Sequence, residues 1–530
     1  MAPPHQTVYD GANQNGTVVE LAAAQEKLQR PDVLNADDFR RQGKQVIELI
    51  ADYYGGISDY PVHPNVTPGF LRKLLPTEAP ACPEPDAFTS ALQDVRDIIL
   101  PGLTHWQSPR HMAHFPASSS TVGALGEALA AGINVNPFTW AASPAGTELE
   151  MVVVDWLGKA LHLPNSLLFA GGGGGTLLAT TGDAILCAVV AARDQKLEQI
   201  GVGRIGDLVV YCSDQTHFAL VKSARIAGIR RDHCREIRTC HANMFALSPM
   251  DLHAAMKADV EAGLVPLFLC ATVGTTKTGA VDPIAGLCAV AAAHDVWVHV
   301  DAAYAGSALV CPEFRHVIDG AEAAVDSFSM NAHKWLLVSN DCCAMWVKKP
   351  RTLIAALAVE QEVIMKDRAS EGHDVVDYMD WNINLTRRFR ALKLWLVLRC
   401  YGTDGLRDHI RSHVRIAEAF EKMVEADARF EVVTERKFSL VCFRLRSPEP
   451  EQSGGEETAN ALNRQLVEEV NAVTSGPYTS FANVGGIYML RWAIGSTLTE
   501  ERHVADAWKV VQERASAILC KMESINASRA

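Results

Sequence analysis

The sequence predicts an α/β protein in which a mostly parallel sheet is followed by a smaller α+β domain. Between about residues 120 and 395, short apolar runs alternate with stretches of helical periodicity, which is typical of parallel strands joined by helices. After about residue 395 the pattern changes to helices with a few strands. A chain of 530 residues is also too long for one hydrophobic core, so we expect two or three domains.

The first part of the chain is expected to form a helix after a disordered terminus. Residues 1–33 are polar and irregular, which predicts disorder. Asn35 is a suitable N-cap for a helix that Gly55 and Gly56 would end. The apolar residues of this helix recur at helical spacing: Phe39, Val46, Ile47, Ile50, Tyr53 and Tyr54. Such an amphipathic helix must cover a surface of its own domain or of a partner subunit.

The rest of the chain supplies the elements of the two predicted domains. Residues 148–161 and 182–193 have helical periodicity. Four apolar runs of strand length are expected to be buried strands: residues 208–211, 267–270, 296–300 and 344–347. In the last part we expect strands at 440–445 and 488–492, and composition predicts a solvated loop at 447–457.

Composition and charge argue against several classes of partner. The formal net charge is -13 without a long basic run, so neither nucleic acid nor an anionic membrane is expected. No apolar run is long enough to span a bilayer, and the N-terminus lacks the apolar core of a signal peptide. The 13 cysteines include no CxxC sequence, which predicts reduced thiols and a cytoplasmic location. No metal site is expected, because His111 and His114 have no third ligand at suitable spacing.

A lysine and an acid carry the strongest chemical signal. Lys334 lies between a histidine and a tryptophan, where a surface lysine is not expected. Asp301 follows the predicted strand 296–300, and ligands of open α/β sheets bind beyond the carboxyl ends of such strands. An amine nucleophile and an acid that can hold a pyridinium nitrogen are what pyridoxal 5'-phosphate requires. A structural ion pair would explain either residue alone, but the two together favour a coenzyme site.

The segment from His299 to Trp335 resembles the group II pyridoxal-dependent decarboxylases, specifically the aromatic L-amino acid decarboxylases, and among them the plant tyrosine and tryptophan decarboxylases. The resemblance extends from about Asn35 to about Ser516. Further matching sequences are residues 103–106, 214–217 and 387–393.

This resemblance implies a fold type I pyridoxal-phosphate enzyme, similar to aspartate aminotransferase, with a central, mostly parallel, seven-stranded sheet flanked by helices. It also implies a homodimer. We therefore expect an N-terminal helical dimer-packing segment at 34–118 and a large coenzyme-binding α/β domain at 119–395. A lid loop is expected at about 355–376 and a small C-terminal α+β domain at 396–530.

A glycine run at residues 171–175 precedes the expected phosphate site. Glycines let backbone amides approach an anion, and a following helix start adds its dipole. Alone the run would indicate a flexible turn, but with a coenzyme lysine present it favours phosphate binding by Thr180, Thr181 and nearby amides. The family usually has a small hydroxyl residue at the position of Gly182, so only the backbone would bind phosphate there.

The resemblance assigns roles to further residues. It implies that His217 stacks on the coenzyme ring and takes part in proton transfer, and that Thr276 holds Asp301 or the ring oxygen. The other implied coenzyme contacts are Ala303, Asn331 and His333. Phe115 and Pro116 would line the substrate pocket. Thr386 matches a site where glycine accompanies indole substrates and serine accompanies phenolic ones, which favours tyrosine or phenylalanine over tryptophan.

The lid holds the main departure from the family, because Ile364 takes the place of a catalytic tyrosine. In relatives that tyrosine donates a proton to Cα and gives an amine, whereas relatives with phenylalanine release an aldehyde, ammonia and peroxide. Isoleucine cannot donate a proton, although His217 or a lid water could substitute as the acid. We expect decarboxylation to tyramine or phenethylamine, with an aromatic aldehyde synthase as the alternative. A catalytically silent scaffold is a third possibility, against which the intact Lys334, Asp301 and His217 argue.

Overall fold

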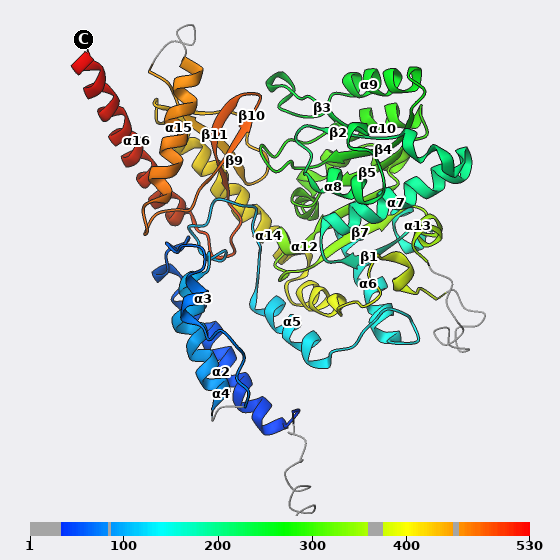
Figure 1. Cartoon of the computed structure of the whole chain (residues 1–530), viewed down its shortest axis with the longest axis horizontal. Coiled ribbons are helices and arrows are strands. Elements are labelled where there is room, and N and C mark those ends of the chain that lie inside the picture. The colour runs from blue at the N-terminus through cyan, green and yellow to red at the C-terminus, as the bar shows by residue number, and fades with distance from the viewer. Residues whose placement is uncertain (1–32, 83–85, 359–374, 449–454, 530) are drawn as a thin grey trace, which may run out of the picture. The chain divides into compact units, whose positions relative to one another are not determined.

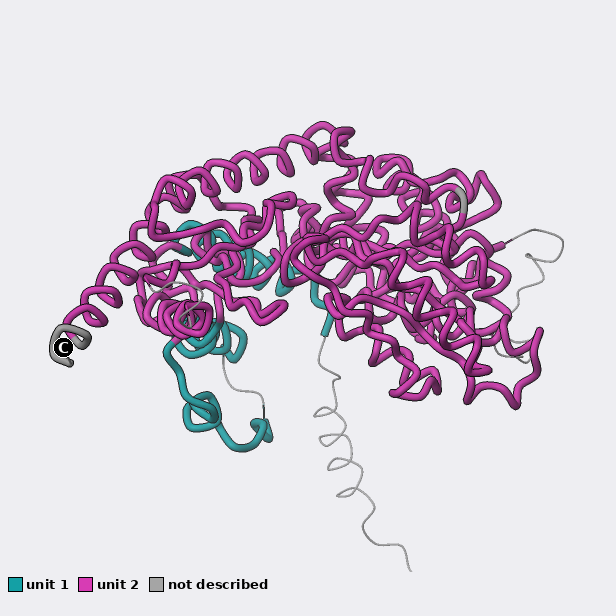
Figure 2. The backbone as a smooth tube through the Cα atoms, turned by 90° about the horizontal axis from the view of Figure 1, so that it is seen from above, with its two compact units in different colours: residues 1–57, 65–103 teal, residues 58–64, 104–530 magenta. Residues whose placement is uncertain are grey.

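The computed structural model describes residues 33–82, 86–358, 375–448 and 455–529, and the chain divides into two compact units (Figure 2). The first unit comprises residues 1–57 and 65–103, and the second comprises residues 58–64 and 104–530. Both β-sheets lie in the second unit. The expectations for residues 1–32 and for most of the lid, including Ile364, fall outside the described residues.

The first unit is helical. It contains α2 (Ala36–Gly55), α3 (Phe70–Leu74) and α4 (Ala87–Asp94). The predicted N-cap is confirmed, since Asn35 Oδ1 accepts hydrogen bonds from the backbone N–H groups of Asp37 and Asp38 at 3.0 and 3.1 Å. No residue of α2 is buried. Its apolar side chains are therefore not part of a hydrophobic core among the residues that the structure describes.

A seven-stranded sheet forms the centre of the second unit (Figure 1). Its strands are β1 (Gly174–Leu178), β2 (Leu208–Ser213), β3 (Cys234–Ile237), β4 (Val265–Thr272), β5 (Trp297–Asp301), β6 (Ser327–Asn331) and β7 (Cys343–Val347). The order is β1-β7-β6-β5-β4-β2-β3. Only the pairs of β7 with β1 and β6 are antiparallel, which confirms the predicted mostly parallel sheet.

Helices cover both faces of this sheet (Figure 1), which explains why most side chains of β2, β4 and β7 are apolar. One face packs against α7 (Thr181–Ile200), α8 (Ala219–Ile226) and α13 (Pro350–Leu357). The other face packs against α6 (Pro144–Ala160), α9 (Pro249–Glu261) and α10 (Ile284–Ala292). In β2, for example, Val209 and Tyr211 belong to one hydrophobic core, whereas Val210 and Cys212 belong to the other.

The four strands predicted for this sheet are confirmed as β2, β4, β5 and β7, and the two predicted helices as α6 and α7. Three strands were not predicted. β1 consists partly of glycine, β3 is a polar edge strand, and β6 contains two serines among five residues. Each lacks the apolar run that identifies a buried strand in sequence.

A second, four-stranded antiparallel sheet follows, with the order β10-β11-β9-β8. Its strands are β8 (Phe430–Val432), β9 (Leu440–Leu445), β10 (Ser480–Val484) and β11 (Ile487–Ala493). The long helix α14 (Arg390–Glu425) precedes it and changes direction at Gly402, where φ is 62°. The predicted strands 440–445 and 488–492 are confirmed.

The helix α15 (Gly455–Asn471) packs against β9 and β11, and α16 (Glu501–Arg529) packs against α15. The predicted loop at 447–457 extends too far, because α15 begins at Gly455. Glu456 and Glu457 lie in its first turn, where acidic side chains favour a helix. Among the described residues, no helix is long and apolar enough to cross a membrane.

Candidate active site

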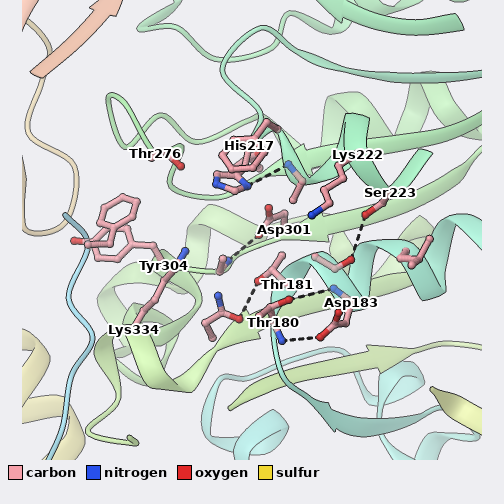
Figure 3. Close-up of a pocket in the computed structure, with 18 of the residues that line it drawn as sticks. Thr180, Thr181, Asp183, His217, Lys222, Ser223, Thr276, Asp301, Tyr304 and Lys334 are labelled. Carbon is pink, nitrogen blue, oxygen red and sulfur yellow. Dashed lines mark hydrogen bonds between the residues drawn. The ribbon is translucent and has the colours of Figure 1, made fainter. Parts of the chain in front are cut away.

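A cavity of about 500 Å³ opens where three neighbouring parallel strands end (Figure 3). Thr272, Asp301 and Asn331 are the last residues of β4, β5 and β6, and all three line it. The carboxyl edge of an open α/β sheet is where ligands bind in such folds. All ten residues predicted to contact a coenzyme line this cavity: Thr180, Thr181, Gly182, His217, Thr276, Asp301, Ala303, Asn331, His333 and Lys334.

Lys334 and Asp301 both face this cavity. Lys334 lies in the short helix α12 (Ala332–Trp335), which starts directly after β6. Asp301 Oδ1 accepts a hydrogen bond from the backbone N–H of Ala303 at 3.0 Å, which fixes the carboxylate. Burial raises the pKa of Asp301 and lowers the pKa of Lys334, and the attraction between the two charges opposes both shifts. In the described part of the chain the two groups make no direct ion pair, so the cavity between them can take a ligand.

The start of α7 forms another side of the cavity. Thr180 is the N-cap, and a capping box joins it to Asp183, whose carboxylate accepts from the Thr180 N–H at 3.1 Å. Thr181 Oγ1 donates to Asn331 Oδ1 at 2.9 Å, and Ser223 Oγ donates to the Gly182 carbonyl at 3.2 Å. These bonds hold the first turn of a 20-residue helix against the sheet, with its positive dipole end toward the cavity. Free backbone N–H groups and the positive end of a helix dipole are the groups that bind phosphates in proteins.

The glycine run at residues 171–175 does not line the cavity, although the sequence predicted that it would contribute to a phosphate site. Gly174 and Gly175 belong to β1 and do not line the cavity. A Cβ at Gly175 would lie 2.3 Å from Val154 Cγ1 and 2.8 Å from the Met345 carbonyl oxygen. Gly175 therefore lets β1 approach α6 and β7 closely, and the helix start at this side of the cavity is formed by residues that follow the strand.

Two histidines at the cavity each accept a backbone hydrogen bond at one ring nitrogen. His217 Nδ1 accepts a hydrogen bond from the Ala219 N–H at 3.2 Å, so the proton of the neutral ring lies on Nε2. His333 Nδ1 accepts from the Cys342 N–H at 2.9 Å. Burial lowers the pKa of His217, and it lowers the pKa of His333 to about 4. Both rings are therefore neutral near pH 7.

The predicted substrate residues are only partly brought together. Phe115 lines the cavity and stacks on Tyr304, with ring centroids 3.7 Å apart. Pro116 is buried but does not line the cavity, and it packs closely against Gly495. Thr386 is exposed and also lies outside the cavity lining. Its role in substrate choice stays a prediction.

Several cavity residues were not predicted, among them Thr272, Lys222 and Tyr304. Thr272 is paired in register with Asp301, and its Oγ1 is buried without a hydrogen-bond partner among the described residues. A buried hydroxyl without a partner is costly unless a ligand satisfies it. The sequence did contain a signal for Thr272 as a site residue. It lies two residues after the predicted strand 267–270, just as Asp301 lies directly after the predicted strand 296–300.

The conserved-domain model of the pyridoxal-dependent decarboxylases matches residues 68–446. The chain belongs to the pyridoxal-dependent decarboxylase family. A tyrosine decarboxylase from Oryza sativa subsp. japonica is 71% identical over 98% of this chain and 100% of its own length. The predicted family, fold class and coenzyme are confirmed.

Two solved structures are similar over most of this chain. Oryza sativa TDC with PLP and tryptamine superposes with a TM-score of 0.89 at 43% identity and covers 92% of this chain and 100% of its own. Rhodiola rosea 4-hydroxyphenylacetaldehyde synthase gives a TM-score of 0.85 at 48% identity, with 92% and 99% covered.

The chain is thus a carboxy-lyase whose coenzyme is pyridoxal phosphate. The residues around the cavity fit this coenzyme: a lysine, a buried acid, a helix N-terminus for a phosphate, and an unpartnered hydroxyl. Bound pyridoxal phosphate supplies an electron sink for the charge left on an α-carbon when its carboxylate departs as carbon dioxide.

Proposed function

We propose that this chain decarboxylates an aromatic L-amino acid, with tyrosine or phenylalanine preferred, to give tyramine or phenethylamine. The observation that carries this proposal is the convergence of Lys334 and Asp301 on one cavity at the carboxyl ends of neighbouring strands. The 71% identity with a rice protein named tyrosine decarboxylase supports the substrate class.

This proposal assigns a role to five of the residues that line the cavity. Lys334 binds the coenzyme covalently through its amine. Asp301 keeps the ring nitrogen protonated, because a buried carboxylate stabilises an adjacent cation. Thr180, Thr181 and the first backbone amides of α7 bind the phosphate. His217, held by the Ala219 N–H, presents Nε2 for proton transfer at the substrate α-carbon.

A second candidate function is an aromatic aldehyde synthase. It is favoured by Ile364, which cannot donate the proton that the family's lid tyrosine supplies. A named 4-hydroxyphenylacetaldehyde synthase at 48% identity makes this chemistry relevant to the family. The amine remains the preferred product here because His217 is retained as an alternative acid.

A product assay separates the two candidates. Purified protein incubated in air with L-tyrosine is expected to give mostly tyramine, measured against 4-hydroxyphenylacetaldehyde and peroxide by chromatography. Mostly aldehyde with stoichiometric peroxide would replace the lead by the second candidate. Absence of any amine or aldehyde product from L-tyrosine and, in a parallel incubation, from L-phenylalanine would contradict both candidates.

The same assay on Ile364→Tyr tests the lid residue. Adding a proton donor should move any aldehyde fraction toward amine. Ile364→Val is the matched control, since it changes the side chain without adding a donor and should leave the ratio as it is. An unchanged ratio in the tyrosine variant would remove Ile364 from the explanation.

We further propose that the protein is a cytoplasmic homodimer with the domain division expected from sequence. The free state of all 13 cysteines supports a reducing compartment. The exposed apolar side chains of α2 support a partner subunit: Phe39 is 71% exposed, and Ile47 and Ile50 are 46% and 39% exposed.

A further inference from the structure

Arg491, in the middle of β11, is a buried cation without an acidic partner. Its side chain is 4% exposed. Nε donates to the Thr276 carbonyl at 2.6 Å and Nη1 donates to the Ala113 carbonyl at 2.8 Å. Nη2 is buried without a hydrogen-bond partner, and no carboxylate pairs with the guanidinium within the described ranges. A buried charge of this kind is costly unless it serves another group.

This cation lies behind the wall of the active-site cavity. Its Cζ is 4.5 Å from the centroid of the Phe115 ring, and Lys334 Nζ is 5.6 Å from the same centroid. The two positive charges are therefore within about 10 Å of each other. Phe115 and Thr276 line the cavity, whereas Arg491 does not, so protein atoms rather than bulk water fill the space between the charges.

We propose that Arg491 is a positioning residue whose fixed positive charge keeps the Lys334 amine in its neutral, nucleophilic form. A guanidinium does not give up its proton in a protein, whereas a lysine amine does so readily in a low-dielectric site. Of two cations held close together, the lysine therefore loses its charge. The proposal rests on the covalent role of Lys334 in the proposed function.

Other groups around Lys334 also act on its charge. They are Asp301 on β5, Cys343 on β7, His217 in the turn after β2 and the adjacent His333. Burial lowers the pKa of Lys334 most, Asp301 and Cys343 oppose this, and Arg491 adds to it. The groups that face Arg491 itself are His114, Tyr304 and Cys442. None of these three carries a charge near pH 7, because burial lowers the pKa of His114, which leaves the ring neutral, and raises the pKa values of Tyr304 and Cys442, which keeps both protonated.

The experiment measures the protonation of Lys334 directly. Full-length protein freed of coenzyme is mixed with pyridoxal phosphate between about pH 6 and pH 10, trapped with borohydride, and the rate of labelling at Lys334 is followed by peptide mass spectrometry. Labelling requires the neutral amine, because the Nζ lone pair forms the bond to the aldehyde carbon. The aldehyde oxygen leaves as water with the two amine protons.

Two variants separate charge from shape. Arg491→Gln removes the charge but keeps donors for the two carbonyls, and the midpoint of the pH profile should rise by roughly one unit, as expected for charges about 10 Å apart at an effective dielectric constant of about 20. Arg491→Lys keeps the charge and should leave the midpoint near that of the unaltered protein. A merely structural role would slow labelling in both variants without moving the midpoint.

An unshifted midpoint in Arg491→Gln, or an equal rise in both variants, would overturn the proposal. If the glutamine variant does not fold, the unaltered protein still provides a test. Its midpoint must lie below the ordinary lysine value of about 10.4, and a midpoint at or above that value would overturn the proposal. No amino acid substrate is present, so a shifted midpoint in a protein that fails to decarboxylate tyrosine would contradict the proposed function alone.

Discussion

Burial is the main cause of the shifted pKa values of the titratable side chains at the active site. Burial disfavours the charged form of each group, so the pKa of Asp301 rises while the pKa values of Lys334 and His217 fall. Asp301 and Lys334 oppose each other's shift through their mutual attraction. Opposite shifts in one cavity are typical of sites where proton transfer and covalent chemistry occur together.

Lys334→Ala tests this site at the residue scale. The variant should lose the visible absorbance of covalently held coenzyme and all detectable turnover. Among the described lysines, Lys334 is the one that lies in a helix directly after a strand of the sheet and shares the cavity with Asp301 at the end of the neighbouring strand. Absorbance spectra and a carbon dioxide release assay measure both. Lys257→Ala is the control, because Lys257 lies exposed on α9, is not among the residues that line the cavity, and pairs with Glu261 at 3.9 Å. Turnover retained by the alanine variant at 334 would place the active site elsewhere.

At the scale of elements, a buried ion pair joins α6, β1 and the segment before α14. Arg387 Nη2 lies 2.6 Å from Glu150 Oε1, and both side chains are 1% exposed. Glu150 Oε1 also accepts from Thr176 Oγ1 and the Leu177 N–H. Removing one partner of such a pair leaves the other buried and uncompensated, which is far more damaging than losing a surface pair.

Glu150→Gln should therefore lower the free energy of unfolding by about 3–5 kcal/mol. Urea unfolding of the full-length protein, followed by tryptophan fluorescence, measures the loss. Glu261→Gln removes an exposed carboxylate of α9 and should change stability by less than about 1 kcal/mol. Equal losses in the two variants would show that the buried pair has no special role.

At the scale of the whole molecule, α2 has exposed apolar side chains and no buried residue within the described part of the chain. Phe39, Ile47 and Ile50 lie on one side of the helix, within about 80° of one another around its axis. A stable helix with an exposed apolar face indicates a partner surface, and a second copy of this chain is the partner proposed here.

Replacing Phe39 and Ile47 by glutamate should weaken a dimer, because two charges would be buried without partners in the interface. Sedimentation velocity over a range of protein concentrations should show dimers for the unaltered chain and a monomer fraction for the variant. Glu48→Lys changes the charge on the opposite side of the same helix, about 100° or more from all three apolar residues, and serves as the control. A monomeric unaltered protein would contradict the homodimer, and an unaffected variant would place the interface elsewhere.

Much of the sheet was predictable because β2, β4, β5 and β7 are buried on both faces, so that most of their side chains are apolar. The same reasoning failed for β1 and β6. In β1, glycine replaces bulky side chains because α6 and β7 approach too closely for a Cβ. In β6, two serines are buried, and both bond to His299 of β5. Neither cause is visible in a single segment of sequence.

The sequence by itself determined which chemistry is available: a lysine in an unusual setting, an acid after an apolar run, and hydroxyl residues at a helix start. These are local features, and local periodicity and composition encode them. Only the tertiary structure decided that Thr272 stands beside Asp301, that Thr386 lies outside the cavity, and that Arg491 lies behind Phe115. Those relations depend on the order of strands in two sheets, which brings together residues far apart in the chain and which no local pattern specifies.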